Sequence, residues 1–324
     1  RQVLRLAAVG AGIGALGIPG ETLRQAIAAS YAGDFRTIAA WHRACADHLY
    51  ALHTRPPAQV AADLLIDLFI VKRQREVSSP AETVELEGVS ATLAGLQANV
   101  LSRLGDHGAA LRWWHTARQA ADASGDRDLQ VLVRAEEAVH GVYGQRDPQS
   151  VLDIIDEAQR LHGPAKPSVA LLSTQAKALS ALGKHDQAQK TLESLLDAAD
   201  KGVTPDPLGF WSPSKIYFAQ SWVYSAMGDE AKAAKIRDQV LSHTRGYQYR
   251  ANVHLHEALS MVVNGGTTEG VRRAAEVIDS IKPAYRTQHI RHTAQMVLDA
   301  VPLEHQDRPG VAELRELLHY QPAT

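Results

Sequence analysis

The sequence has very little cysteine and no strong excess of charge of either sign. Cys45 is the single cysteine in 324 residues, so the chain can form no internal disulfide and no zinc site built from several cysteines. One thiol suits a reducing compartment, and we expect a cytoplasmic protein with Cys45 as a small buried side chain. The formal net charge is −2 at pH 7, which argues against a chain that coats nucleic acid by itself.

Motifs for common cofactors and catalytic centres are also missing. The chain has no phosphate loop of the Walker type, no HExxH, no GxSxG and no Cys/His array. His289 and His292 could share one helix face, but no carboxylate accompanies them, and we interpret them as surface or capping histidines. We therefore expect no enzyme activity, no cofactor and no metal, and we assign no catalytic residue.

The longest apolar stretch opens the sequence, with RQVLRLAAVGAGIGALGIPG at residues 1–20. It is too short and too rich in glycine to span a bilayer as a helix. Its basic start resembles a targeting sequence, including a twin-arginine signal that has lost its first arginine. We interpret residues 1–19 as a linker or a truncated targeting-like segment, and residues 20–324 as a repeat domain that ends in capping helices.

Turn signals recur along the rest of the chain at glycines that are 72, 39, 39, 45 and 37 residues apart: Gly33, Gly105, Gly144, Gly183, Gly228 and Gly265. Each glycine follows one run of helical periodicity and precedes another, and almost no segment alternates like a strand. The pattern predicts helix pairs in which glycine ends the first helix, because the cap residue often needs a positive φ. The expected pairs and single helices cover 20–53, 57–75, 82–124, 127–162, 167–200, 211–243, 247–282, 284–300 and 309–319.

Small residues sit at fixed offsets from these glycines. An alanine lies seven residues before the glycine in several first helices, as Ala98 and Ala176 do, and five after it in several second helices, as Ala110 and Ala188 do. Alanine at a crossing lets two helices pack closely. The offsets resemble the tetratricopeptide repeat. That resemblance implies an all-α fold, a right-handed superhelix of helix pairs whose first helices line a concave groove.

The groove supplies the candidate binding residues. They lie about six residues before each turn glycine, or one helical turn away: Asn99, Arg103, Arg134, Lys177, Lys215, Phe218, Trp222, Asn252 and His256. Amide, guanidinium and ammonium groups can bind a peptide backbone or a carboxylate, and aromatic rings can anchor an apolar group. Two structural alternatives stay open: Asn99 faces water, and Phe218 or Trp222 belongs to the core.

The opening segment and the degenerate repeats together resemble the C-terminal region of actinobacterial helix-turn-helix (XRE-type) regulators. Arg1, Leu4 and Arg5 would match an Arg-Arg-x-x-Leu-Arg-like segment that joins the DNA-binding domain to the repeats. Such regulators are similar to the peptide-sensing repeat regulators of Gram-positive bacteria, in which inner-helix asparagines hold a signal peptide and the assembly is commonly a dimer. The resemblance implies peptide contacts at Asn99 and Asn252, and a homodimer.

The sequence thus predicts the sensory and dimerising repeat domain of a bacterial transcriptional regulator, with a short peptide or small molecule as its ligand. No helix-turn-helix with a basic recognition helix is visible, so DNA would be contacted only through a domain outside this chain, and no membrane is expected as a partner. Two alternatives from other classes remain: a constitutive protein–protein interaction scaffold without a small ligand, and an exported repeat protein.

Overall fold

The computed structural model describes residues 35–163, 168–202, 214–244 and 246–319. Within these ranges the chain forms helices joined by turns and contains no β-strand, which confirms the all-α prediction. The chain divides into two compact units between Leu129 and Gln130, a boundary that falls inside helix α7 (Arg127–His140). The prediction of one repeat domain did not anticipate this division. Residues 1–19 and the expected turn at Gly33 lie outside the described residues.

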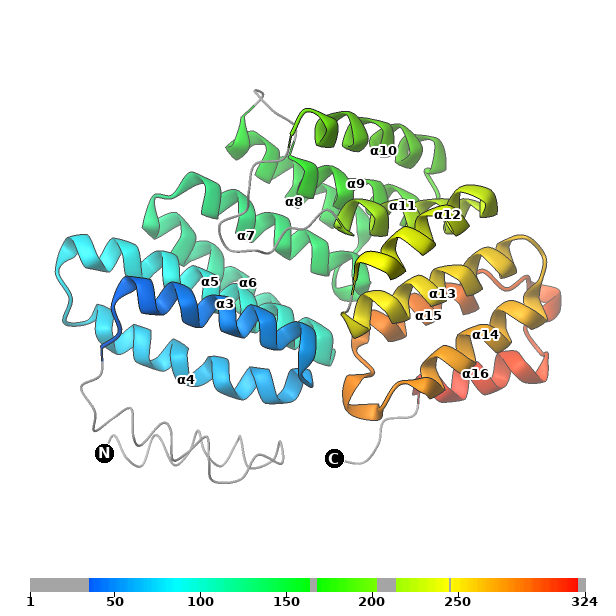
Figure 1. The fold of residues 1–324 in the computed structure, drawn as a ribbon, viewed down its shortest axis with the longest axis horizontal. Coiled ribbons are helices and arrows are strands. Elements are labelled where there is room, and N and C mark those ends of the chain that lie inside the picture. The colour runs from blue at the N-terminus through cyan, green and yellow to red at the C-terminus, as the bar shows by residue number, and fades with distance from the viewer. Residues whose placement is uncertain (1–34, 164–167, 203–213, 245, 320–324) are drawn as a thin grey trace. The chain divides into compact units, whose positions relative to one another are not determined.

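Unit 1 is built on one long helix, α5, which packs against all three of its neighbours. The helices are α3 (Ile38–Thr54), α4 (Pro57–Arg75), α5 (Pro80–Leu104) and α6 (His107–Ser124), drawn in blue to cyan in Figure 1. The Ser79 side chain caps the start of α5 by accepting from the Glu82 backbone N–H, and Pro80 suits the first turn. The Trp41 indole donates to Gln74 Oε1 at 2.9 Å, so a buried polar contact joins α3 to α4.

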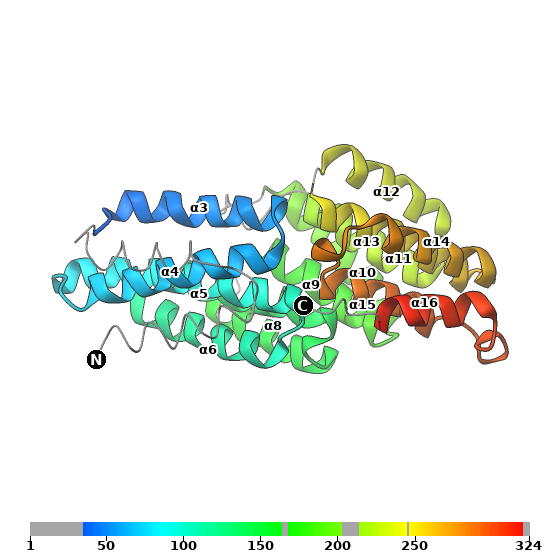
Figure 2. The same ribbon diagram turned by 90° about the horizontal axis from the view of Figure 1, so that it is seen from below.

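Unit 2 consists of consecutive helix pairs. After α7 and the irregular turn η1 (Gly141–Gln145), the helices are α8 (Pro148–His162), α9 (Val169–Ala181), α10 (His185–Asp200), α11 (Ser214–Met227), α12 (Glu230–His243), α13 (Tyr247–Val263), α14 (Thr267–Ser280), α15 (Gln288–Asp299) and α16 (Pro309–His319). Short 3₁₀ turns occupy Pro283–Tyr285 and Leu303–His305. Helix α16 packs on α14 and α15 at the end of the unit (Figure 2). The right-handed superhelical path stays a prediction.

The described turn glycines and crossing alanines behave as the repeat pattern predicts. Positive φ angles of 83°, 81°, 70°, 75° and 90° occur at Gly105, Gly144, Gly183, Gly228 and Gly265. The alanines at the predicted crossings have no exposed surface: Ala98, Ala110, Ala176, Ala188, Ala233 and Ala258. Close packing at each crossing therefore depends on a side chain no larger than a methyl group.

The first helices of the pairs in unit 2 form an inner row in which α9 packs on α11, α11 on α13, and α13 on α15. The turn η1, which ends the first inner helix, packs on both α9 and α15. The row is therefore closed on itself, since the end of α7 reaches the last inner helix. Side chains expected to line an open groove are buried here instead; Lys177 is 4% exposed and Trp222 has no exposed surface.

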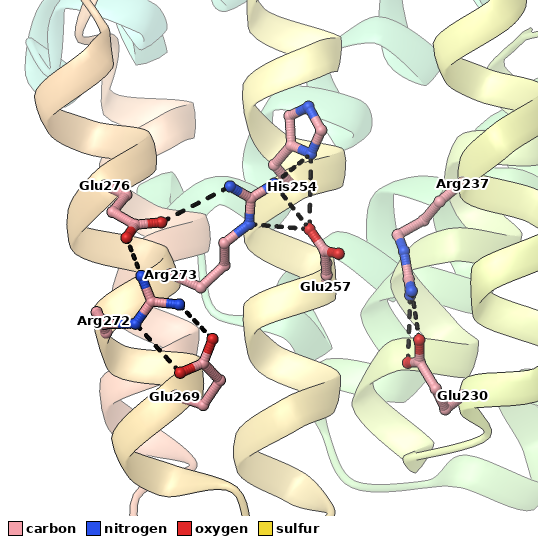
Figure 3. A network of polar contacts seen from close by, with 8 residues as sticks. All are labelled: Glu230, Arg237, His254, Glu257, Glu269, Arg272, Arg273 and Glu276. Atoms are coloured by element: carbon pink, nitrogen blue, oxygen red, sulfur yellow. Dashed lines mark hydrogen bonds and ion pairs between the residues drawn. The ribbon is translucent and has the colours of Figure 1, made fainter.

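An ion pair joins α14 to α13, and further ion pairs lie within α14 (Figure 3). Arg273 on α14 donates to Glu257 on α13 at 3.0 Å. Arg272 pairs with Glu269 and Glu276 along the exposed face of α14. Exposed pairs of this kind contribute only about 0–1 kcal/mol each, so apolar packing rather than this network holds α13 against α14.

Candidate functional site

Charged and aromatic side chains meet in the interior of unit 2, between the elements of the inner row. We call this group the inner cluster, and it consists of Glu136, His140, Tyr143, Lys177, Lys215, Phe218, Trp222, His256 and His289. Most of these side chains are buried, and Lys215 retains 16% of its side-chain surface. Charged groups rarely lie inside a protein unless they are paired, so the pairing of each member decides what the cluster can do.

Among the described residues, Lys177 is the charged member of the cluster without a polar partner. It lies on α9 six residues before Gly183, and its Nζ is 5.9 Å from the ring centroids of both Tyr143 and Phe218. Among the described residues, no hydrogen bond or ion pair reaches the amine. Burial, helped by the charge of Lys215 and opposed by that of Glu136, lowers the pKa of Lys177 to about 7.

The carboxylate that could neutralise Lys177 is already held by other groups. Glu136 Oε1 accepts from Lys215 Nζ at 2.9 Å, and Glu136 Oε2 is 3.7 Å from His140 Nε2. Burial by itself would raise the pKa of Glu136, but Lys215 and His140 outweigh it and hold that pKa at about 2. Glu136 is therefore ionised at neutral pH and paired with Lys215, which leaves Lys177 without a counterion in the described part of the chain.

His256 on α13 is a buried polar side chain that carries no charge at neutral pH. It has no exposed surface, and its Nδ1 is 3.0 Å from Ser221 Oγ, while its Nε2 has no hydrogen-bond partner among the described residues. Burial, together with the charges of Arg237 and Lys177, lowers the pKa of His256 to about 3. The imidazole is thus uncharged at pH 7, and its ring lies 5.1 Å from that of Phe218 and 5.6 Å from that of Trp222.

Two further buried polar atoms lie near His256. Trp222 Nε1, a donor, and Asn252 Oδ1, an acceptor one turn before His256, both lack a hydrogen-bond partner in the described structure. An unsatisfied buried polar atom costs about 1–3 kcal/mol. Such atoms are uncommon in folded proteins and call for a physical explanation.

A histidine pair holds the two ends of the inner row together. His140 Nδ1, at the end of α7, is 2.9 Å from His289 Nε2 on α15, across 149 residues of sequence. The Tyr143 ring packs on His289 with centroids 4.1 Å apart and on Trp222 with centroids 5.6 Å apart. His289 has no exposed surface, so its interpretation as a surface or capping histidine was wrong. The closing contact of η1 with α15 buries it.

The structure brings together five of the predicted residues: Lys177, Lys215, Phe218, Trp222 and His256 lie in the inner cluster, and Asn252 lies one turn from His256. Arg134 instead donates to Glu157 Oε1 at 2.8 Å and to the Gln130 carbonyl at 3.2 Å. Sequence reasoning missed Glu136, His140, Tyr143 and His289. Tyr143 directly precedes the turn glycine Gly144, and this position was the one local signal for it.

Asn99 and Arg103 belong to unit 1 and contact each other. Arg103 Nε donates to Asn99 Oδ1 at 2.8 Å, and Arg103 Nη1 donates to the Leu52 carbonyl at 2.7 Å, near the end of α3. The Asn99 and Arg103 side chains therefore serve to dock α3 on α5, because the last carbonyls of a helix need donors from outside it. Whether either residue also contacts a ligand stays a prediction.

Metal binding finds no support in the described part of the chain. No group of three or more His, Cys, Asp or Glu side chains is placed there to hold a metal ion. Cys45, predicted to be a buried side chain, is 3% exposed. Burial and the nearby Asp67 raise the pKa of its thiol to about 12, so it is not a thiolate nucleophile at neutral pH. None of the described helices has the length and apolar character needed to cross a membrane.

Comparison with known proteins finds no relative of this chain: no family model, no curated protein and no solved structure matches it.

Proposed function

We propose that this chain is the ligand-binding, sensory domain of a bacterial transcriptional regulator, and that its ligand, a short peptide or a small molecule, binds at the inner cluster. The observation that carries the proposal is Lys177, a buried ammonium near two aromatic rings that has no carboxylate partner among the described residues. Burying a charge without a partner is unfavourable. A binding site can accept that cost because a ligand later supplies the missing partner.

The position of the cluster suits a site at which ligand binding changes the arrangement of the repeats. Its members come from α7, η1, α9, α11, α13 and α15, so a ligand there would contact several repeats at once. A ligand shifts a conformational equilibrium only as far as it prefers one arrangement over another. Contacts to several repeats give the ligand that preference, because any change in the curvature of the row alters them together.

The regulator assignment itself rests on the resemblance of the opening segment and the repeats to the C-terminal region of helix-turn-helix regulators. In this proposal the protein acts in the cytoplasm as a homodimer, and DNA is contacted by a domain outside these residues. The chain is a binding protein rather than an enzyme, and no residue is given a catalytic role.

Retention of a natural ligand tests the proposal. The purified chain is mixed with a small-molecule and peptide extract of its host, separated by gel filtration, denatured, and analysed by mass spectrometry for released compounds. The wild type should retain a compound that Lys177→Met retains at least tenfold less. Lys190→Met, at an exposed lysine on α10, is the matched control and should behave as the wild type.

Two results would overturn this proposal. If the wild type retains no compound, the chain is better described as a protein–protein scaffold. If Lys177→Met retains the compound as well as the wild type, binding takes place elsewhere on the chain.

A further inference from the structure

We propose that the ligand of the inner cluster is a monocarboxylate with an apolar or aromatic body, whose carboxylate pairs with the Lys177 ammonium while its body packs beside the rings of Tyr143, Phe218 and Trp222. This inference rests on the proposed function and names the class of ligand for the same site.

The charges of the cluster favour a single negative charge. Lys177 and Lys215 carry two positive charges when protonated, and Glu136 carries one negative charge that Lys215 already pairs. His256 is neutral, and the nearby Arg237 is paired with Glu230. Among the described residues named here, the remaining excess is one positive charge, which one carboxylate balances. A phosphate monoester, with a charge of about −1.5 to −2 at pH 7, would leave buried negative charge.

The environment of Lys177 favours an ion over a neutral acceptor. A pair between an ammonium and a carboxylate is about twice as strong as a neutral hydrogen bond. In a buried site the attraction is also less screened by water. A neutral amide would accept a hydrogen bond from the amine but would leave its positive charge unbalanced, so the site should discriminate against an amide of the same shape.

The residues around the amine indicate which chemical groups the rest of the ligand should carry. The centroids of the Tyr143 and Phe218 rings each lie 5.9 Å from Nζ, and Tyr143 also packs on Trp222. Trp222 Nε1 is a buried donor without a partner, and an indole N–H can only donate. A carboxylate has two oxygens, so one can accept from Lys177 while the other remains for a second donor in the same cluster.

Competitive acetylation of the full chain tests the ligand class. Only the neutral amine reacts with acetic anhydride, so a brief pulse at pH 7, followed by mass spectrometry of each lysine, reports the neutral fraction of Lys177. The probes are 3-phenylpropanoate and its neutral amide, 3-phenylpropanamide. With a pKa of about 7 the amine is about half neutral. If the carboxylate raises that pKa by about one unit, the neutral fraction falls to about one tenth and labelling slows about fivefold.

Control ligands and a control lysine show whether the change in labelling is specific to the carboxylate and to Lys177. The amide should leave Lys177 labelling unchanged, and the exposed Lys190 should react equally in every sample. The dipeptide Gly-Phe and its C-terminal amide show whether the carboxylate can come from a peptide end or only from a small acid. Phenyl phosphate measures the response to a dianion.

The inference is overturned if 3-phenylpropanoate and Gly-Phe both leave Lys177 labelling unchanged, if the amides slow it as much as the acids, or if phenyl phosphate slows it more strongly. If Lys177 does not react with the anhydride at all, NMR of chain carrying ¹³Cε-labelled lysine gives the same answer. In that measurement the acid must raise the titration midpoint of Lys177 and the amide must leave it unchanged.

The two proposals fail in distinguishable ways. A retained natural compound that depends on Lys177 but carries no carboxylate would refute the ligand class and leave the sensory function standing. Protection of Lys177 by carboxylates, with no natural compound retained, would support the ligand class and count against the sensory function.

Discussion

Lys177 is the residue on which the functional account depends. Its ammonium is buried near aromatic rings, while Glu136, a carboxylate that interacts with it, is paired with Lys215. A lysine whose pKa is lower in the folded state than in the unfolded state destabilises the fold wherever the unfolded chain holds the proton more tightly. In the proposed function, a bound ligand would offset this destabilisation of the free protein.

The first prediction is that Lys177→Met is more stable than the wild type at pH 7. Methionine fills a similar volume without a charge, and replacing buried charges by apolar groups often stabilises by about 1–4 kcal/mol. Because the folded pKa is about 7 and the ordinary value is 10.5, the wild-type penalty is full below about pH 7 and fades as the pH rises toward 10.5. The advantage of the variant should shrink by up to about 1.4 kcal/mol per pH unit.

Urea unfolding of both proteins at pH 7 and pH 9 measures this difference. Lys190→Met serves as the control, and its stability should follow that of the wild type at both values. A destabilised Lys177→Met, or an advantage that grows with pH, would contradict the account of the buried amine.

The sequence predicts where Lys177 lies but does not predict that its amine is buried without a polar partner. Its offset from Gly183 places it on the inner face of a first helix, and that placement follows from helical periodicity alone. The absence of a partner depends on Glu136 pairing with Lys215, 79 residues further along the chain. Such a pairing is set by the packing of different repeats, so no local pattern in one sequence contains it.

At the scale of elements, the contacts of Arg103 show how a predicted ligand residue can be structural. Arg103 joins Asn99 on its own helix to the Leu52 carbonyl near the end of α3. The periodicity of α5 placed Asn99 and Arg103 on one face. It could not show that α3 covers that face, because the sequence between these helices does not specify how they pack.

The second prediction follows from this contact. Arg103→Met should destabilise the protein by about 2–4 kcal/mol, since hydrogen bonds to charged groups contribute about 1.5–3 kcal/mol and a buried carbonyl is left without a donor. Asn99→Ala should cost less, because the bond to Leu52 remains. Urea unfolding measures both, with the exposed Arg112→Met as the control. Equal stabilities for the Arg103 and Arg112 variants would refute the docking role.

The third prediction concerns the crossing of α13 and α14. A Cβ at Gly270 would lie 2.6 Å from Val262 Cγ2 and 2.7 Å from the Ala258 carbonyl oxygen, so even a methyl group cannot fit without moving α14. Gly270→Ala should lower stability by about 1–3 kcal/mol.

Gly88 in α5 offers a control. A Cβ there would lie 3.7 Å from its nearest neighbour, Leu129, and Gly88→Ala should be neutral or stabilising by up to about 1 kcal/mol. Thermal unfolding compares the two, and equal effects would show that the crossing tolerates a larger residue.

At the scale of the whole molecule, the repeat architecture could be predicted and its closure could not. Glycine spacing and alanine offsets gave the helix pairs, because one turn residue and one crossing residue are local requirements. The expected helices at 57–75 and 309–319 agree with α4 and α16. The expected open groove did not allow for η1 packing on α15, a contact between the two ends of the inner row. It depends on small rotations added over several repeats, which no single repeat encodes.

The titration of the Lys177 amine tests the central claim most directly. NMR of the chain carrying ¹³Cε-labelled lysine, with the Lys177 signal identified by its loss in Lys177→Met, gives the midpoint for this one group. The account predicts a midpoint of about 7 in the free protein. A midpoint near the ordinary value of 10.5 would show that the amine is solvated or paired, and the inner cluster would then have no unbalanced charge for a ligand to neutralise.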